Sequence, residues 1–124
     1  MTPVLKRWIP SLIVMAVIFL FSSRSANELP YFDWADQLVK KSGHAVGYGL
    51  LAYSYLYALG ENRKRYGLAW MFSILFAITD EIHQSFVPGR HPSPLDVMLF
   101  DNFGALVALS LTYYYLKLTS RSKT

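Results

Sequence analysis

The chain has 124 residues, of which 53% are hydrophobic and only 16% are charged, and this balance excludes an ordinary soluble domain. It contains no cysteine, so disulfide frameworks and thiolate chemistry are excluded as well. The net charge of +4 does not indicate nucleic-acid binding, because the basic residues lie at the ends of apolar runs, as they do in membrane proteins.

The first apolar run covers residues 8–23 and is preceded by Lys6 and Arg7. With its flanks, at about residues 5–23, it is just long enough to cross the hydrocarbon core of a membrane as a helix. A signal peptide is the alternative, because two basic residues, a short apolar core and the small residues SSRSA follow one another. We favour a retained helix, since three further spans follow and an even number of spans places both termini on one side.

A long segment of mixed composition, SANELPYFDWADQLVKKSG, separates the first run from the second. Asp33 is a suitable cap for a short helix on which Trp34 and Leu38 share one face. We expect this segment to form an interfacial helix that lies on the outer membrane surface.

Three further apolar runs follow, at about residues 43–60, 66–87 and 95–116, and each is long enough for a transmembrane helix. Inside lipid the backbone must satisfy its own hydrogen bonds, and runs of this length do so as helices. The predicted fold is therefore all-α. It is one domain over residues 1–124, a polytopic membrane protein with four transmembrane helices and a short interfacial helix.

The distribution of Lys and Arg predicts the orientation of these spans. With the N-terminus inside, eight of these residues fall in inner segments and four in outer segments. The positive-inside rule then places both termini in the cytoplasm. We expect a multi-pass protein of the cell inner (cytoplasmic) membrane. The inner residues are Lys6, Arg7, Arg63, Lys64, Arg65, Lys117, Arg121 and Lys123, and the outer ones are Arg24, Lys40, Lys41 and Arg90.

The ionisable residues of the last three spans gather at the predicted outer face. Singly, each has a simple explanation: a carboxylate ends a span or favours a helix N-terminus, a histidine lies at an interface, and glycines allow close packing. Together they favour a site, because ionisable groups at membrane depth face the bundle interior and pair. The residues at this face are His44, Asp80, Glu81, His83, Gln84, Arg90, His91, Asp96, Asp101 and Asn102, with Tyr48 one turn from His44 and Gly43, Gly47 and Gly49 nearby.

These motifs resemble the VanZ-like family, small multi-span bacterial membrane proteins named after a teicoplanin-resistance accessory protein. The resemblance covers about two-thirds of the chain and rests on KSGH at residues 41–44 with Tyr48, DEIHQSFVPGR at residues 80–90, Asp96, and DNFG at residues 101–104. The family pattern implies an acidic or amide residue four positions after its Asp and a Gly three later. Here Phe100 is four positions after Asp96, so either Asp96 or Asp101 is displaced from the family spacing.

The resemblance implies a role in the bacterial cell envelope, with glycopeptide (teicoplanin) resistance in some members, and no defined reaction. Our first hypothesis is a binding protein for an anionic lipid headgroup, a lipid-linked envelope precursor or a glycopeptide, with membrane lipids as its partners. The alternative is an intramembrane hydrolase or transferase that acts on a phospholipid or lipid-linked envelope precursor. In that case adjacent carboxylates and a histidine supply general acid–base chemistry while basic residues hold a phosphate.

The predicted site has two groups of residues. We assign catalytic roles, for the enzyme hypothesis, to Asp80, Glu81 and His44, and ligand binding to Lys41, Tyr48, Gln84, Arg90, Asp96 and Asp101. A divalent metal held by Asp80, Glu81 and His44 is an open alternative, but we assign no metal site because no familiar zinc spacing such as H-E-x-x-H is present. The pattern identifies neither a cofactor nor an oligomeric state. We further expect His44 to lie near the Asp80–Gln84 turn, and Arg90 to pair with Asp80, Glu81 or Asp96.

Overall fold

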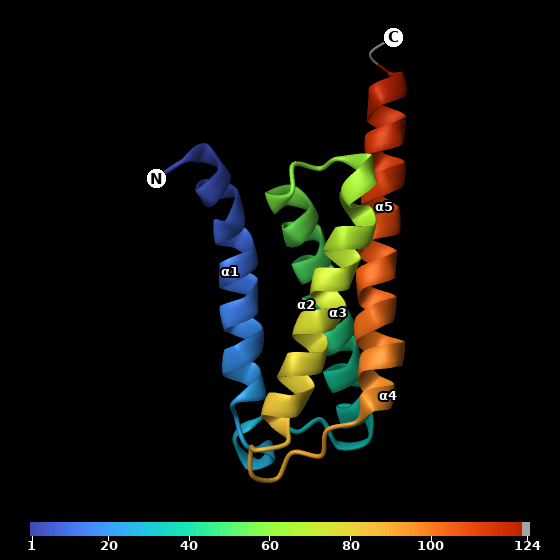
Figure 1. Ribbon diagram of the computed structural model, residues 1–124. Coiled ribbons are helices and arrows are strands. Elements are labelled where there is room, and N and C mark those ends of the chain that lie inside the picture. The colour runs from blue at the N-terminus through green and yellow to red at the C-terminus, as the bar shows by residue number, and fades with distance from the viewer. Residues whose placement is uncertain (123–124) are drawn as a thin grey trace.

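The computed structural model describes residues 1–122, and every regular element within them is helical (Figure 1). The all-α prediction is therefore confirmed. Lys123, which we counted among the inner basic residues, lies outside the described residues. The elements are α1 (Pro3–Ser22), α2 (Asp36–Ala58), α3 (Tyr66–Gln84), α4 (Pro94–Asp96), a π turn (Val97–Asp101) and α5 (Asn102–Arg121), with short 3₁₀ turns at Ala26–Glu28, Asp33–Ala35 and Arg63–Arg65.

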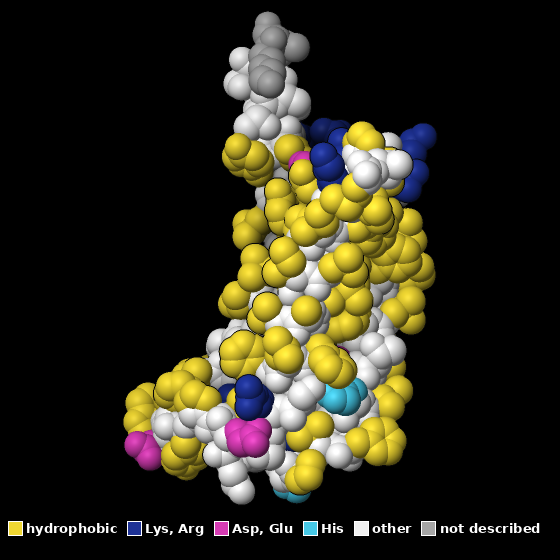
Figure 2. Space-filling model, turned by 90° about the vertical axis from the view of Figure 1, so that its left-hand side faces the viewer, with side chains coloured by type: hydrophobic (Ala, Val, Ile, Leu, Met, Phe, Trp, Pro, Cys, Tyr) yellow, Lys and Arg dark blue, Asp and Glu magenta, His cyan; other side chains and the backbone are white. Residues whose placement is uncertain are grey.

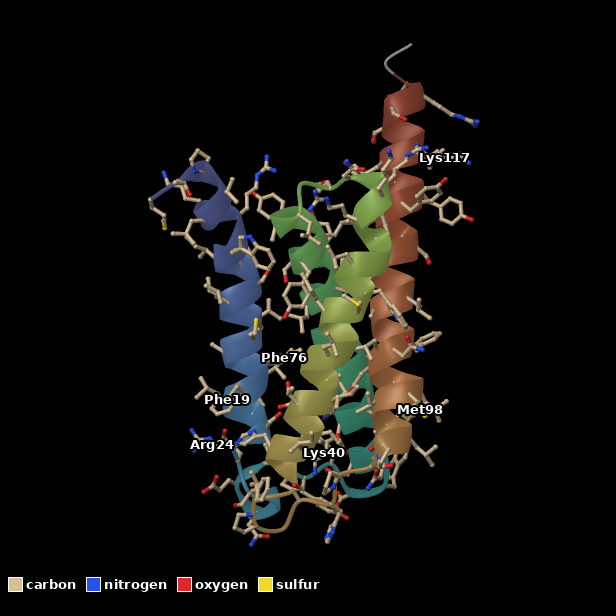
Figure 3. The ribbon with its side chains drawn as sticks, in the orientation of Figure 1. Phe19, Arg24, Lys40, Phe76, Met98 and Lys117 are labelled. Atoms are coloured by element: carbon tan, nitrogen blue, oxygen red, sulfur yellow. The ribbon has the colours of Figure 1, made fainter. Side chains whose placement is uncertain are left out.

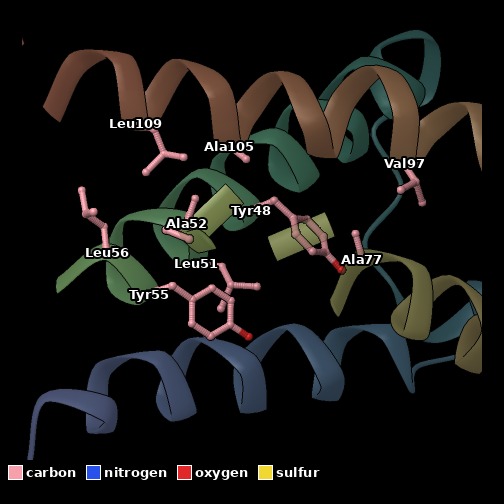
Figure 4. Close-up of a cluster of buried hydrophobic side chains, with 10 residues drawn as sticks. Tyr48, Leu51, Ala52, Tyr55, Leu56, Ala77, Val97, Ala105 and Leu109 are labelled. Carbon is pink, nitrogen blue, oxygen red and sulfur yellow. The ribbon is translucent and has the colours of Figure 1, made fainter. Parts of the chain in front are cut away.

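The four long helices lie side by side and alternate in direction, so the N- and C-terminal ends of the chain are at the same end of the bundle (Figure 1). Helix α2 packs against α1, α3 and α5 and is the central helix. Its buried side chains include Tyr48, Leu51, Tyr55 and Leu56, which form the middle of the apolar core (Figure 4). In contrast, the only α1 residues classed as buried are Ser11 and Ser22.

Small residues set the distance between α2 and α5. A Cβ atom added to Gly104 would overlap the backbone carbonyl of Ala45, and one added to Gly49 would lie 3.0 Å from the Gly104 carbonyl oxygen. The close approach therefore needs glycine at both positions. The other two glycines of the predicted packing group contribute less, since Gly43 has no neighbour within 4 Å and Gly47 only touches Ile18.

The expected interfacial helix is not a separate element. Asp33 has a φ of 50°, in the left-handed region, whereas a helix N-cap residue is extended. Helix α2 begins almost at once, at Asp36, where Lys40 donates to the Asp36 carboxylate across one turn at 2.8 Å and supports the first turn. Lys40 and Lys41 consequently lie on α2 rather than in a loop.

The third helix also ends earlier than predicted, at Gln84 rather than at residue 87. The chain then turns at residues 87–90, where the Arg90 N–H donates to the Val87 carbonyl at 3.2 Å. Pro88 and Gly89 occupy the two central positions, and Gly89 has a φ of 75°. This is the residue order of a type II turn, which requires a positive φ at its third position.

Large apolar side chains cover the outside of the bundle, while charged side chains gather at its two ends (Figure 2). In the described part of the chain, two helical stretches have the length and apolarity of a membrane span, Pro3–Ser22 and Pro94–Arg121. Helices α2 and α3 do not pass the same test. The structure thus confirms four long helices, but four membrane crossings remain a prediction.

Candidate polar site at one end of the bundle

The carboxylate of Asp80 is the centre of a hydrogen-bond network that joins three helices. Its Oδ2 accepts from the Ser22 hydroxyl of α1 at 2.8 Å and from the Tyr48 hydroxyl of α2 at 3.0 Å. Gln84, one turn along α3, donates to the same oxygen at 3.1 Å and to the Ser22 oxygen at 3.1 Å. All four residues are buried. A carboxyl oxygen that accepts from three donors fixes the relative positions of α1, α2 and α3 at this end.

His44 contacts the end of the π turn and reaches the Asp80 network only through Tyr48. Its Nδ1 lies 3.3 Å from Oδ1 of Asp101, which is buried, but the contact lacks hydrogen-bond geometry and is therefore electrostatic. The His44 ring is nearly parallel to the Tyr48 ring, with 6.2 Å between the centroids. Tyr48 thus connects His44 with Asp80. The expectation that His44 lies near the Asp80–Gln84 turn stays a prediction, since the polar contact of His44 is with Asp101 and its link to Asp80 runs through Tyr48.

Asp96 and Asp101 both reach α2, although five positions separate them. Lys41 Nζ lies 3.7 Å from Asp96 Oδ1, and His44, three residues further along α2, meets Asp101. In an α-helix a five-residue separation would rotate the second side chain by about 140° from the first. The π turn at Val97–Asp101 takes up the additional residue and brings both aspartates to the same side. Both Asp96 and Asp101 therefore face α2, despite the five-residue separation.

Glu81 lies in a different environment from its neighbour Asp80. It borders a groove of about 490 Å³ between α3 and the α4–α5 segment, and its Oε1 is buried with no hydrogen-bond partner among the described residues. The indole N–H of Trp70 donates to Asn102 at 2.7 Å within this groove. Asp80 and Glu81 therefore do not act as one carboxylate pair. The groove is lined by Trp70, Ile74, Ile78, Glu81, Ile82, Pro94, Val97, Met98 and Asn102.

Arg90 does not make the ion pair that we expected. Within the described residues it pairs with none of Asp80, Glu81 and Asp96. The turn at residues 87–90 fixes its backbone at the rim, and its side chain is half-buried.

The Lys40 ammonium, also at this end (Figure 3), holds the pKa of Asp36 below its ordinary value by hydrogen bonding.

A family model described as VanZ/LLP1 matches residues 7–117. The chain belongs to the VanZ/LLP1 family. The resemblance that the motifs indicated is thereby confirmed, and together with the two apolar helices VanZ/LLP1 membership points to a membrane protein. Neither the curated proteins nor the solved structures gave a match.

Sequence reasoning missed one member of the network in this VanZ/LLP1 protein, Ser22. We had considered it only as part of the SSRSA stretch of a possible cleavage site, whereas its hydroxyl is 3% exposed and bonded to Asp80. The sequence signal that could have found it is its predicted depth in the membrane. Ser22 lies at the outer end of the first span, as Asp80 and Gln84 lie at the outer end of the third. His83, in contrast, stacks on Phe19 at 4.5 Å and serves the contact between α1 and α3.

The VanZ/LLP1 site offers acceptors and donors but no metal cage. Among residues 1–122, no three His, Asp or Glu side chains come close enough together to hold a metal ion. What the structure brings together is a buried layer with two hydrogen-bonded or charge-paired carboxylates, and above it a rim with basic side chains. The buried layer contains Ser22, Tyr48, Asp80, Gln84 and Asp101, with the half-buried His44 beside it, and the rim contains Lys41, Arg90 and Asp96.

Proposed function

We propose that this protein is a multi-pass protein of the bacterial cytoplasmic membrane that binds a phosphate-bearing group at the outer end of its bundle. The phosphate belongs to an anionic lipid headgroup or a lipid-linked envelope precursor; a glycopeptide is the third candidate ligand and, having no phosphate, would meet the basic rim through a carboxylate. A contribution to glycopeptide resistance would then follow from binding at the outer face. In this arrangement residues 43–58 of α2 and the whole of α3 cross the membrane, and both are less apolar than α1 since each carries part of the polar site.

The orientation of the bundle supports this proposal. Arg63, Lys64 and Arg65 lie between α2 and α3, at the end of the bundle where the N- and C-terminal ends also lie (Figure 1). Figure 3 shows Lys117 toward this end, and Arg24 and Lys40 at the opposite end. The excess of basic residues favours the cytoplasm for the first end, which leaves the polar site at the outer face.

The observation that carries the function is the convergence of polar side chains from all four long helical segments on one end of an otherwise apolar bundle. At the rim, Lys41 is only loosely paired with Asp96, at 3.7 Å, and both side chains are 37% exposed. Arg90 has no ion pair within the described structure. Two basic side chains are therefore available for a phosphate, and the planar guanidinium can hold two of its oxygens.

The test is lipid retention by the protein purified in mild detergent, measured by native mass spectrometry. We expect wild type to retain a phosphate-bearing lipid, and the double variant Lys41→Ala/Arg90→Ala to lose most of it. Arg90→Lys should lose almost as much as Arg90→Ala, because an ammonium cannot reproduce the two-pronged contact. Arg24→Ala is the matched control, since Arg24 is an exposed cation at the same end. Equal loss in Arg24→Ala would refute a specific rim site.

An enzyme is the second candidate, and one observation favours it. Asp101 is 2% exposed and lies against Nδ1 of His44, whose side chain is 32% exposed. A buried carboxylate in this position orients an imidazole and leaves its Nε2 free to accept a proton. If the protein is a hydrolase or transferase, His44→Gln should abolish conversion of a lipid extract while it leaves lipid retention within about twofold of wild type. Unchanged lipid masses after incubation with wild type would count against this candidate.

A further inference from the structure

The groove between α3 and the α4–α5 segment results from the way the helices pack. Helix α5 lies against α2 at the Gly49–Gly104 contact. Tyr66, at the start of α3, packs edge-on against Tyr113 of α5, and from there the two helices diverge toward the polar end of the bundle (Figure 1). The space that opens between them has a volume of about 490 Å³.

The two walls of the groove are aliphatic. On α3, Ile74, Ile78 and Ile82 recur every four residues and therefore lie on one face of the helix. Val97 and Met98 line the opposite wall. Ile78, Ile82 and Met98 are 45%, 57% and 67% exposed, so the groove is open along its side. In the proposed membrane arrangement this side faces the hydrocarbon of the bilayer.

The two ends of the groove are polar. At the end nearer residues 59–65, the Trp70 indole N–H donates to Asn102 at 2.7 Å and joins the two walls. Glu81 lies toward the other end, and it is the only ionisable side chain among the described residues that line the groove. The groove is therefore closed by a hydrogen bond at one end and bordered by a carboxyl group at the other.

The Glu81 end of the groove adjoins the rim of the candidate site. Pro94 and Val97 line the groove and flank Asp96 in the chain, and Asp96 pairs with Lys41 at 3.7 Å. Lys41 is one of the two rim cations to which we assign the phosphate. A ligand that holds its phosphate at the rim therefore lies next to the entrance of the groove.

The dimensions of the groove match one hydrocarbon chain. Trp70 and Glu81 are eleven residues apart on α3, about 16 Å along the helix axis. This is close to the about 15 Å of hydrocarbon in one membrane leaflet. The volume of about 490 Å³ over this length gives a cross-section of about 30 Å². The body of an α-helix, about 10 Å wide, needs more than twice that area, whereas a single extended chain does not.

We propose that the groove binds one hydrocarbon chain of an outer-leaflet lipid, with the polar end of the chain at Glu81 and its other end toward the Trp70–Asn102 hydrogen bond. This inference rests on the proposed function and deepens it, because it assigns the phosphate at the rim to a lipid and gives the lipid chain a site of its own. Bilayer hydrocarbon is as apolar as the groove walls, so packing and position, not the hydrophobic effect, favour the bound chain.

The experiment uses the full chain in detergent and a phosphatidylglycerol that carries a photoactivatable diazirine in one acyl chain. Mass spectrometry of the crosslinked peptides locates the label, which we expect within residues 70–82 and 94–102. Ile78→Trp fills the groove from α3 and should lower this labelling about fivefold. Met98→Trp fills it from the opposite wall and should have the same effect, so a folding defect in one variant does not decide the test.

Leu75→Trp is the matched control. Leu75 is 52% exposed on the same helix but does not line the groove, so labelling in this variant should stay within about twofold of wild type. Label spread evenly over the outside of the four long helices, and unchanged in Ile78→Trp and Met98→Trp, would refute a chain-binding groove. A crosslink between two copies of the protein, or a dimer that Ile78→Trp dissociates, would assign the groove to a second copy and also refute it.

The outcomes separate this inference from the function on which it rests. If Lys41→Ala/Arg90→Ala abolishes lipid retention while neither groove variant changes the labelling, the groove inference is refuted and the phosphate site stands. If the labelling falls in Ile78→Trp and Met98→Trp but persists in Lys41→Ala/Arg90→Ala, the chain site is supported and the phosphate site is refuted. If none of these substitutions has an effect, both are refuted.

Discussion

The two ends of the bundle use charged residues in opposite ways. At the end with residues 59–65, Arg63 and Lys117 lie over the Tyr113 ring, at 5.4 and 5.9 Å from its centroid, and Tyr66 packs edge-on against the same ring. At the other end the carboxylates of Asp80 and Asp101 are buried inside the bundle. Cations beside aromatic rings at a surface suit a membrane interface, whereas buried acids require partners. Under the proposed function, the first end anchors the bundle at the membrane interface and the second recognises the ligand.

The strongest test of this comparison asks which end faces outward. The chain contains no cysteine, so a single introduced thiol reports its own accessibility. In intact cells, an impermeant maleimide should label His91→Cys almost completely and Lys64→Cys hardly at all, since the two exposed positions lie at opposite ends. Lys64→Cys should react after the cells are lysed. The reverse pattern would place the polar site in the cytoplasm.

The next largest effect is expected from Asp80→Ala. Loss of the carboxylate leaves three buried donors without their shared acceptor, which should lower the free energy of unfolding by about 3 kcal/mol. At the other end, Arg63→Ala should change it by less than about 0.5 kcal/mol. Tryptophan fluorescence during unfolding in detergent measures both. If the two substitutions lowered the free energy of unfolding equally, the Asp80 network would contribute no more to stability than an exposed cation does.

Two glycines provide a matched pair of backbone positions. Gly104→Ala should destabilise the protein by about 2 kcal/mol, because the new methyl group overlaps the Ala45 carbonyl and must push α5 away from α2. Gly67, near the start of α3, has no neighbour within 4 Å of an added Cβ. Gly67→Ala should therefore leave stability unchanged or raise it by up to about 1 kcal/mol. A stable Gly104→Ala protein would contradict the close helix contact.

The smallest effects separate two tyrosines. Tyr48→Phe removes one buried hydrogen bond to Asp80 and should cost about 1 kcal/mol while it also weakens lipid retention. Tyr113→Leu removes two cation–π contacts and should cost a similar amount or less, with lipid retention at the outer site unchanged. Thermal unfolding and native mass spectrometry on the same samples distinguish them. Reduced lipid retention in Tyr113→Leu would contradict the assignment of lipid binding to the opposite end of the bundle.

Hydropathy and charge pattern were sufficient to predict the four long helices and the gathering of polar residues at one end. They are properties of many residues at once, so single errors matter little. The start of α2 was not predictable in this way, since it depends on the Asp36–Lys40 contact and on the left-handed backbone of Asp33. Each of these two features changes the free energy of the local backbone conformation only slightly, so tertiary packing decides where the helix begins.

The site was harder to predict than the fold, because its contacts depend on the distances between helices. Nothing in the local sequence shows that α2 and α5 cross closely at Gly49 and Gly104, or that His44 meets Asp101 beside this crossing. Ser22 is a single hydroxyl with no periodic pattern around it. Arg90 was expected to reach a carboxylate because opposite charges attract, but the turn at residues 87–90 holds its backbone at the rim.

The π turn at Val97–Asp101 has a consequence for how relatives of this chain should be aligned. An inserted residue normally rotates everything after it in a helix by about 100°. Here the wider turn absorbs that rotation, so Asp101 and Gly104 keep their faces toward α2 although Asp96 is one position further away than the family spacing implies. Helix length can therefore vary within the site itself without loss of its geometry. A sequence alignment that allows gaps only in loops would place Asp101 one position away from the corresponding acidic residue of its relatives. Superposition of the helices would align the two residues.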